Sequence, residues 1–298
     1  MTSLRDVPPA LVGEVEAAGL DPDALWDLLG RAFDEDLGEG GDATTLATVD
    51  ADARATGRFN AREPGVVAGL GLAVVAFHLA CGTDLEVTDR VPDGTHVAAG
   101  DPVMTVSGPA RGLLTAERTA LNLASHLSGV ATATSHWVAA LEGTRARVLD
   151  TRKTLPGLRA LQKYAVRCGG GVNHRSSLSE MAMVKDNHVV AAGGAVAAYE
   201  RVRAARPDLR VEVEVTDLDQ LRDLLAAGCS EILLDNMAPA TTAEAVRLTA
   251  GRATLEASGG LTLERAREVA ETGVDFISVG ALTHSVRVFD LGLDLHED

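Results

Sequence analysis

The stretch RVLDTRK (147–153) begins a rhythm that decides the fold of this chain. Five further short runs rich in apolar residues follow it: MVKDNH (183–188), RVEVEVTD (210–217), EILLDN (231–236), ATLEASGG (253–260) and DFISVGALTH (275–284). Stretches with helical spacing lie between them, such as LDQLRDLLAAG (218–228) and LERAREVAETG (263–273). Strands that alternate with helices indicate βα units and a parallel sheet. Since fewer than eight units are present, we expect an open, incomplete α/β barrel of about six or seven parallel strands.

The part of the chain before this rhythm has a different pattern. A helix is predicted after Asp21-Pro22, partial alternation at 52–63 favours a strand with one wet face, and 71–80 is apolar enough for a buried helix. Two more strand candidates, DLEVTDRV (84–91) and DPVMTVSGP (101–109), complete an α+β, sandwich-like unit of roughly 115 residues. Helical spacing then continues over 115–142, and we expect two helices broken near Ser128-Gly129.

Composition excludes several classes of protein. No run approaches the length of a membrane span, the N-terminus lacks the pattern of a signal peptide, and three scattered cysteines fit a reducing cytoplasm. A net charge of −16 argues against a nucleic-acid partner. The eight histidines form no HExxH pattern, so we expect no dedicated metal site.

Positive charge is concentrated between Arg145 and Lys185. This segment holds nine basic residues against two acidic ones, whereas the rest of the chain holds eighteen against forty-one. All three lysines, Lys153, Lys163 and Lys185, fall inside it, although arginine is used everywhere else. Such a cluster attracts anions, and a lysine suits a position that needs a compact ammonium. Lys163 is ambiguous, because its amphipathic run also fits a solvated helix face.

Each predicted barrel strand ends in polar residues, and in βα barrels the active site forms at these carboxyl ends. Alternation in VEVEV places Glu212 and Glu214 on one face, where they need cations or hydroxyls; a structural ion pair remains the alternative, most of all for Glu212. The loops at Ser258–Gly260 and at Gly280 leave backbone N–H groups free at helix starts, which is a common way to hold a phosphate.

The expected site therefore has three parts. A cationic part suits an anionic acceptor, a carboxylate part suits ribose hydroxyls, and the glycine loops suit a sugar phosphate. The cationic part comprises Arg152, Lys153, His174, Arg175 and Lys185; the carboxylate part comprises Glu214 and Asp235; the loops supply Ser258, Gly259, Gly260 and Gly280. This combination indicates transfer of a phosphoribosyl group to an anionic acceptor.

The chain resembles the quinolinate phosphoribosyltransferase family over nearly its whole length. The resemblance is carried by EDLGEGGDATT (35–45), ERTALNLASHLSG (117–129), DTRKTLPGLRALQKYAVRCGGGVNHR (150–175), KDNH (185–188), VEVEV, LLDN, LEASGG and SVGALTH. It departs from the family pattern by one extra glycine in EDLGEGGDATT, in a turn with no expected chemical role.

The resemblance implies a reaction, a domain plan and an assembly. Quinolinate and phosphoribosyl pyrophosphate would give nicotinate mononucleotide, pyrophosphate and carbon dioxide in de novo NAD synthesis. Residues 1–117 would form the N-terminal domain with 286–298 packed back on it, and 118–285 the barrel. The protein would be a homodimer in which Arg118 completes the neighbouring site. Mg²⁺ would arrive with phosphoribosyl pyrophosphate.

Family roles also carry over to matching positions. The resemblance implies that Arg118, Arg152, His174 and Arg175 hold the quinolinate carboxylates and that Lys153 lies between the two substrates. It implies that Lys185 contacts the donor's phosphates, that Glu214 and Asp235 contact the ribose, and that Ser258 to Gly260 and Gly280 take the 5′-phosphate. Two alternatives stay open: a relative with another acceptor, such as the protein linked to molybdenum transport, and a non-catalytic anion-binding barrel.

Overall fold

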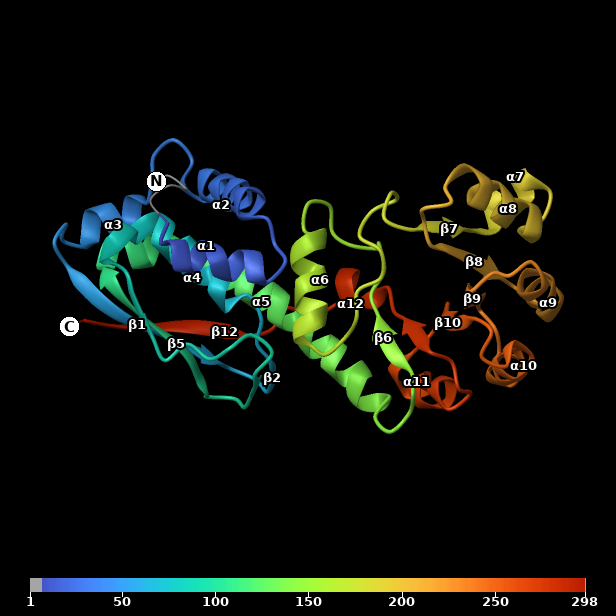
Figure 1. Ribbon diagram of the computed structural model, residues 1–298. Helices are drawn as coiled ribbons and strands as arrows, with labels where there is room; N and C mark the ends of the chain where they lie inside the picture. The colour runs from blue at the N-terminus through green and yellow to red at the C-terminus, as the bar shows by residue number, and fades with distance from the viewer. Residues whose placement is uncertain (1–6, 298) are drawn as a thin grey trace. The chain divides into compact units, whose positions relative to one another are not determined.

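The computed structural model describes residues 7–297 (Figure 1), and the chain divides into two compact units. The first comprises Met1–Thr132, Ala160–Gly169 and Val286–Asp298, and the second comprises Ala133–Arg159 and Gly170–Ser285. None of the helices in the described residues combines the length and the apolar character that crossing a bilayer requires.

An antiparallel sheet in the order β12-β1-β5-β3 organises the first unit. Its strands are β1 (Arg54–Ala61), β3 (Glu86–Thr88), β5 (Pro102–Pro109) and β12 (Leu291–Glu297), and a separate pair joins β2 (Gly65–Val66) to β4 (His96–Val97). The end of the chain thus pairs with β1, and burial along β1 alternates as the sequence predicts, with Ala55 and Phe59 buried. Figure 1 shows β12 (red) beside β1.

The helices of this unit begin and end where local signals place them. They are α1 (Pro9–Ala17), α2 (Pro22–Leu37), α3 (Ala43–Thr48), α4 (Leu70–Cys81), the 3₁₀ turn η2 (Gly82–Asp84), α6 (Arg159–Cys168) and the first part of α5 (Ala110–Ala140). Asp21 caps α2 by accepting hydrogen bonds from Asp23 and Ala24. The expected buried helix is α4, of which all residues but Ala80 are buried.

Helix α5 corrects one prediction. It is a single helix of 31 residues with no break at Ser128-Gly129. A Cβ at Gly129 would overlap the carbonyl of Arg287, so glycine is needed there for close approach of the C-terminal segment rather than to end the helix. The boundary expected at 117/118 falls inside this continuous helix, whereas the compact units divide after Thr132.

The second unit contains the expected parallel sheet. Its strands are β6 (Arg147–Leu149), β7 (Ala182–Val184), β8 (Val211–Val215), β9 (Glu231–Asp235), β10 (Thr254–Ser258) and β11 (Phe276–Ser278), in the order β6-β11-β10-β9-β8-β7. All five strand pairs are parallel. The first two strands of this sheet along the chain, β6 and β7, are its two edges, so the barrel is open between them, in agreement with the sequence-based prediction.

Helices follow five of the strands of this sheet along the chain. They are α7 (Asp186–Ala192), α8 (Ala195–Ala205), α9 (Leu218–Ala226), α10 (Pro239–Thr249), α11 (Leu263–Ala270) and α12 (Ala281–His284). In Figure 1, α8, α9 and α10 follow one another along the outer side of the strands. The buried valines of β8 and the buried run Ile232–Leu234 in β9 pack under these helices, as expected for strands covered on both faces.

Lys163 on α6 does not lie on a solvated helix face. Its side chain is 2% exposed and has a partner. An ammonium held this deeply in a fold needs compensation, so the alternative of a surface lysine is wrong.

Candidate active site

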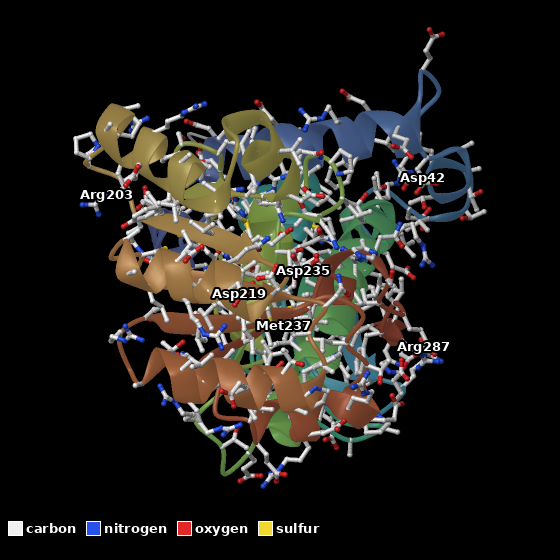
Figure 2. All side chains as sticks on the ribbon, turned by 90° about the vertical axis from the view of Figure 1, so that its right-hand side faces the viewer. Asp42, Arg203, Asp219, Asp235, Met237 and Arg287 are labelled. Carbon is white, nitrogen blue, oxygen red and sulfur yellow. The ribbon has the colours of Figure 1, made fainter. Side chains whose placement is uncertain are left out.

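A cavity of about 560 Å³ lies at the carboxyl ends of the parallel strands, and we name it the carboxyl-end cavity. It is lined by Thr151, Arg152, Lys153, His174, Arg175, Met183, Lys185, Glu214, Leu233, Asp235, Asn236, Glu256, Ser258, Gly259, Gly260 and Ser278. Ten residues predicted from the sequence are among them. Asp235 is labelled near the centre of Figure 2.

Two predicted residues are not in this lining. Arg118 is exposed on α5, at a position that belongs to the first compact unit, and its role stays a prediction. Gly280 lies against the side chain of Lys153, which lines the cavity: a Cβ at Gly280 would lie 2.8 Å from Cδ of Lys153. The missing side chain therefore lets the lysine stem pass, which is a reason for glycine that the sequence did not reveal.

Two guanidinium groups in the cavity retain binding capacity. Nε of Arg152 is buried and has no hydrogen-bond partner in the described part of the chain. Arg175 is 8% exposed and donates through one nitrogen to the carbonyl of Met181 at 2.8 Å. Burial, and next the charge of Arg152, lower the pKa of Arg175. Two like charges held together in a buried setting are stabilised when an anion bridges them.

The backbone of Lys153 is fixed on both sides. Its N–H donates to Oγ1 of Thr151 at 3.0 Å, and its carbonyl accepts from Oγ1 of Thr283 at 2.7 Å. Arg159 adds a further tie by donating to Oγ1 of Thr154 and to the carbonyl of Ser176. These hydrogen bonds fix the backbone of the loop after β6. The exposed side chain of Lys153 can therefore contact a ligand with little further loss of backbone entropy.

Lys185 and Glu214 face each other across the ends of β7 and β8. Nζ of Lys185 donates to Oε2 of Glu214 at 2.8 Å, with side-chain exposures of 47% and 11%. The ammonium lies mostly in solvent, where an ion pair contributes about 0–1 kcal/mol. A phosphate can therefore compete for Lys185 at small cost.

The loops after β9 and β10 fit tightly together. Asn236 adopts positive φ (52°), donates its N–H to the carbonyl of Ser258 at 2.9 Å, and donates through Nδ2 to Asp235 at 2.9 Å. Gly259 and Gly260 also have positive φ, and a Cβ at Gly259 would overlap the side chain of Asn236. Asn236 was missed in the sequence analysis, although asparagine after a strand is a typical residue for positive φ.

A buried cluster forms the inner wall of the cavity. Nε2 of His174 lies 2.9 Å from Oε2 of Glu212 and 3.4 Å from Oε2 of Glu256, and all three side chains are less than 10% exposed. The loop that carries His174 is anchored by Asp150, which accepts from the backbone N–H of His174 at 2.8 Å and from Nδ2 of Asn173 at 2.6 Å. Glu212 thus has a buried hydrogen-bond partner in His174 where the sequence analysis kept a structural ion pair open. Glu256 was missed, because only the folded chain reveals its partner.

The carboxyls of Glu212 and Glu256 favour a second proton on the His174 ring, whereas the backbone N–H of Arg175 opposes it. Burial lowers the pKa of His174, but hydrogen bonds and charges from Glu212 and Glu256 outweigh it and raise the pKa to about 9. The N–H of Arg175, however, donates to Nδ1 of His174 at 2.8 Å, and a doubly protonated ring has no lone pair there. We therefore assign the neutral ring with the proton on Nε2. Burial raises the pKa of Glu212, which places the extra proton on this carboxyl.

The same contact decides whether the cluster suits a metal ion. His174, Glu212 and Glu256 offer three ligand atoms within 4.8 Å of one another. A metal on Nε2 requires the proton on Nδ1, but Nδ1 accepts from the Arg175 N–H. The arrangement thus holds a proton rather than a metal ion.

Comparison with known proteins gives a consistent result. The N-terminal domain of quinolinate phosphoribosyl transferase matches residues 42–128, and its C-terminal domain matches residues 130–294. The nicotinate-nucleotide pyrophosphorylase (carboxylating) of Mycobacterium leprae is 54% identical over 277 residues, covering 92% of this chain and 98% of that protein. A probable enzyme of the same name from Bacillus subtilis is 39% identical, covering 91% and 93%.

Solved structures resemble the whole chain as well. The NadC structure from Streptococcus pyogenes has a TM-score of 0.90 at 39% identity and covers 93% of this chain and 98% of that one. The nicotinate-nucleotide pyrophosphorylase of Francisella tularensis has a TM-score of 0.86 at 35% identity, with coverage of 92% and 96%.

Proposed function

The chain belongs to the quinolinate phosphoribosyltransferase family. On this premise we propose which residues of the carboxyl-end cavity bind each substrate and which take part in the reaction. The reaction moves a phosphoribosyl group to quinolinate with loss of carbon dioxide and yields nicotinate mononucleotide for NAD biosynthesis. The observation that carries the assignment of this cavity is its excess of unpaired cations at the ends of the parallel strands.

The acceptor half is built on Arg152, Lys153 and Arg175. Quinolinate carries two adjacent carboxylates, and the free Nε of Arg152 and the remaining donors of Arg175 match such a pair in number and charge. Each charge-assisted hydrogen bond contributes about 1.5–3 kcal/mol. The role predicted for His174 is narrower in this proposal: both of its ring nitrogens have protein partners, so it supports Arg175 and the cavity wall.

The donor half is built on the loops after β8, β9 and β10. The backbone N–H groups of Ser258 to Gly260 suit the 5′-phosphate, Asp235 and Glu214 suit the ribose hydroxyls, and Lys185 suits the pyrophosphate. Gly280 serves this half by letting Lys153 reach the space between the substrates. Glu214 and Asp235 also provide the carboxylate oxygens that fit Mg²⁺ accompanying phosphoribosyl pyrophosphate, where the ion would neutralise charge on the leaving group.

In this arrangement the ring nitrogen of quinolinate attacks the anomeric carbon as pyrophosphate leaves. Positive charge develops on the ribose, and the carboxylates Glu214 and Asp235 lie at the end of β8 and β9 to stabilise it. The cations hold the two substrates in line, which lowers the entropic part of the barrier. Lys153, Glu214 and Asp235 are accordingly the proposed catalytic residues.

The proposal extends to assembly and location. Arg118 is exposed and, in the homodimer that the resemblance implies, contributes to the neighbouring site. Reduced cysteines and a net charge of −16 support a cytoplasmic protein without a nucleic-acid partner.

A product assay tests the proposal. Purified protein is incubated with quinolinate, phosphoribosyl pyrophosphate and Mg²⁺, and nicotinate mononucleotide and released carbon dioxide are measured together. Equal amounts of both products are expected. A binding protein without activity would give neither product, and a transferase for another acceptor would consume the donor only when that acceptor is supplied.

A further inference from the structure

A second cavity of about 200 Å³ lies below the first, at the amino ends of the parallel strands, and we name it the amino-end cavity. Its lining includes Arg210 and the first residues of three strands, Glu231 of β9, Thr254 of β10 and Phe276 of β11. Its charged groups also include Glu180 and the buried Glu212.

Only three residues line both cavities: His174, Arg175 and Glu256. Glu256 is 3% exposed, and its Oε2 lies 3.4 Å from Nε2 of His174, which in turn lies 2.9 Å from Oε2 of Glu212. Glu212 lines only the amino-end cavity. A chain of hydrogen-bonding groups therefore runs from the amino-end cavity to a carboxyl group that faces the carboxyl-end cavity.

The proposed reaction needs a proton at the pyridine ring inside the carboxyl-end cavity. When carbon dioxide leaves, the bond between C2 of the pyridine and its carboxylate breaks and the electron pair stays on C2, beside the cationic ring nitrogen. The product carries hydrogen at C2, so one proton must arrive there. Among the cations proposed to hold the carboxylates in the carboxyl-end cavity, Arg152 and Arg175 are guanidinium groups and do not release protons at neutral pH. Lys153 is the third of these cations and is assigned to the space between the two substrates.

We propose that Glu256 is a catalytic residue that donates this proton to C2. The proposal rests on the function proposed above. A C–H bond forms and Glu256 is left as a carboxylate. Glu212, which shares a side-chain hydrogen bond with Glu256, passes its proton to Glu256 and is reprotonated by water in the amino-end cavity, while His174 stays neutral. Atoms and charge balance, since the one proton consumed enters from solvent and the carbon dioxide leaves as a neutral molecule.

The charges around the cluster support its role as a proton store. Burial raises the pKa of Glu212, and the neighbouring charge and hydrogen bond of Glu256 act in the same direction, against the effect of His174. Arg175 is engaged by the carbonyl of Met181, and Arg210 forms a two-point pair with Glu231. In the described residues neither arginine forms an ion pair with Glu212 or Glu256, and burial favours the protonated form of Glu212.

The test compares Glu256→Gln with Glu180→Gln, which removes a carboxylate from the amino-end cavity, leaves the Arg210–Glu231 pair in place and keeps an oxygen that can accept from the Ser176 N–H. Glu256→Gln should lower kcat by about 100- to 10,000-fold, the usual contribution of general acid catalysis, with the KM for quinolinate within about threefold. The solvent deuterium isotope effect on carbon dioxide release and product formation should rise about twofold or more, because protonation becomes the slow step. Glu180→Gln should keep both values.

Two results would overturn the proposal. One is a kcat for Glu256→Gln within about threefold of the unmodified protein, which would mean that water protonates C2. The other is a fall in kcat with an unchanged isotope effect, which would mean that Glu256 only positions His174 and Arg175. If thermal unfolding shows that Glu256→Gln does not fold, Glu256→Met, which also lacks an acidic group, takes its place with the same two criteria. An unmodified protein that makes no nicotinate mononucleotide would overturn the proposed function instead.

Discussion

The two ends of the parallel sheet use the same residue types in different ways. At the amino end, Arg210 makes a two-point ion pair with Glu231 at 2.8 and 2.6 Å. At the carboxyl end, Arg152 keeps a buried Nε without a partner in the described residues. The guanidinium of Arg175 donates to a backbone carbonyl, that of Met181, and forms no ion pair with a described residue. Paired arginines stabilise the fold, whereas unpaired ones store binding energy for a ligand. The comparison therefore locates the binding site at the end of the sheet where the arginines have no carboxylate partner among the described residues.

The largest expected effect concerns Lys185 and Arg118. Lys185→Ala removes the ammonium proposed for the donor's pyrophosphate, and Arg118→Ala removes the cation proposed to come from the neighbouring subunit. Each variant alone should lose activity by about 10- to 150-fold, because each charge-assisted contact to a substrate contributes about 1.5–3 kcal/mol.

Mixing the two variants separates sharing between subunits from action within one chain. Random exchange in a two-fold dimer should restore roughly a quarter of the unmodified activity, since one site of each mixed dimer is intact. Mass measurement of tagged subunits shows whether exchange took place. An inactive mixture after complete exchange would mean that Arg118 acts within its own chain.

A smaller loss is expected when an arginine at the carboxyl end becomes a lysine. Arg175→Lys keeps the charge but removes the planar fork that grips a carboxylate, so kcat/KM for quinolinate should fall by about 10- to 100-fold. Arg210→Lys is the matched control at the amino end, where an exposed ion pair is worth about 0–1 kcal/mol, and its kcat/KM should stay within about twofold. Equal losses in both variants would remove the distinction between the two ends.

The sequence predicted those parts of the site that depend on local patterns of residues. The polar residues at strand ends, such as Lys185 and Asp235, can be predicted from the sequence, because side chains alternate between the two faces of a strand and this alternation is visible in a short run of residues. The His174–Glu256 contact is not readable in this way, since it joins segments far apart in the chain. The continuity of α5 was missed for a similar reason: Gly129 looks like a helix breaker until the backbone of Arg287 is seen against it.

The smallest expected effect compares two glycines of the turns around β10. Gly259 (φ 93°) follows β10 at the carboxyl end, and Gly251 (φ 76°) precedes it at the amino end. Replacement by alanine costs about 1–2 kcal/mol of unfolding free energy at either position because of the positive φ. Gly259→Ala should cost about 1–3 kcal/mol more, because the new Cβ overlaps Asn236, whereas nothing lies within 4 Å at Gly251.

Urea unfolding of both alanine variants measures this difference. Gly259→Ala should also raise the KM for phosphoribosyl pyrophosphate by about tenfold, which corresponds to about 1.4 kcal/mol, since the loop proposed to hold the 5′-phosphate must shift. Gly251→Ala should leave that KM unchanged. If both variants lose the same stability and neither changes the KM, the loop after β10 is not the phosphate site.

The central claim is that the unpaired cations at the carboxyl end are matched to two adjacent carboxylates. Competition between quinolinate and nicotinate as acceptors, measured as the ratio of their kcat/KM values at saturating donor, tests it most directly. Nicotinate lacks the second carboxylate and would leave a buried cation without a partner, so the ratio should favour quinolinate by about 10- to 150-fold or more. Comparable turnover of the two acids would contradict the account.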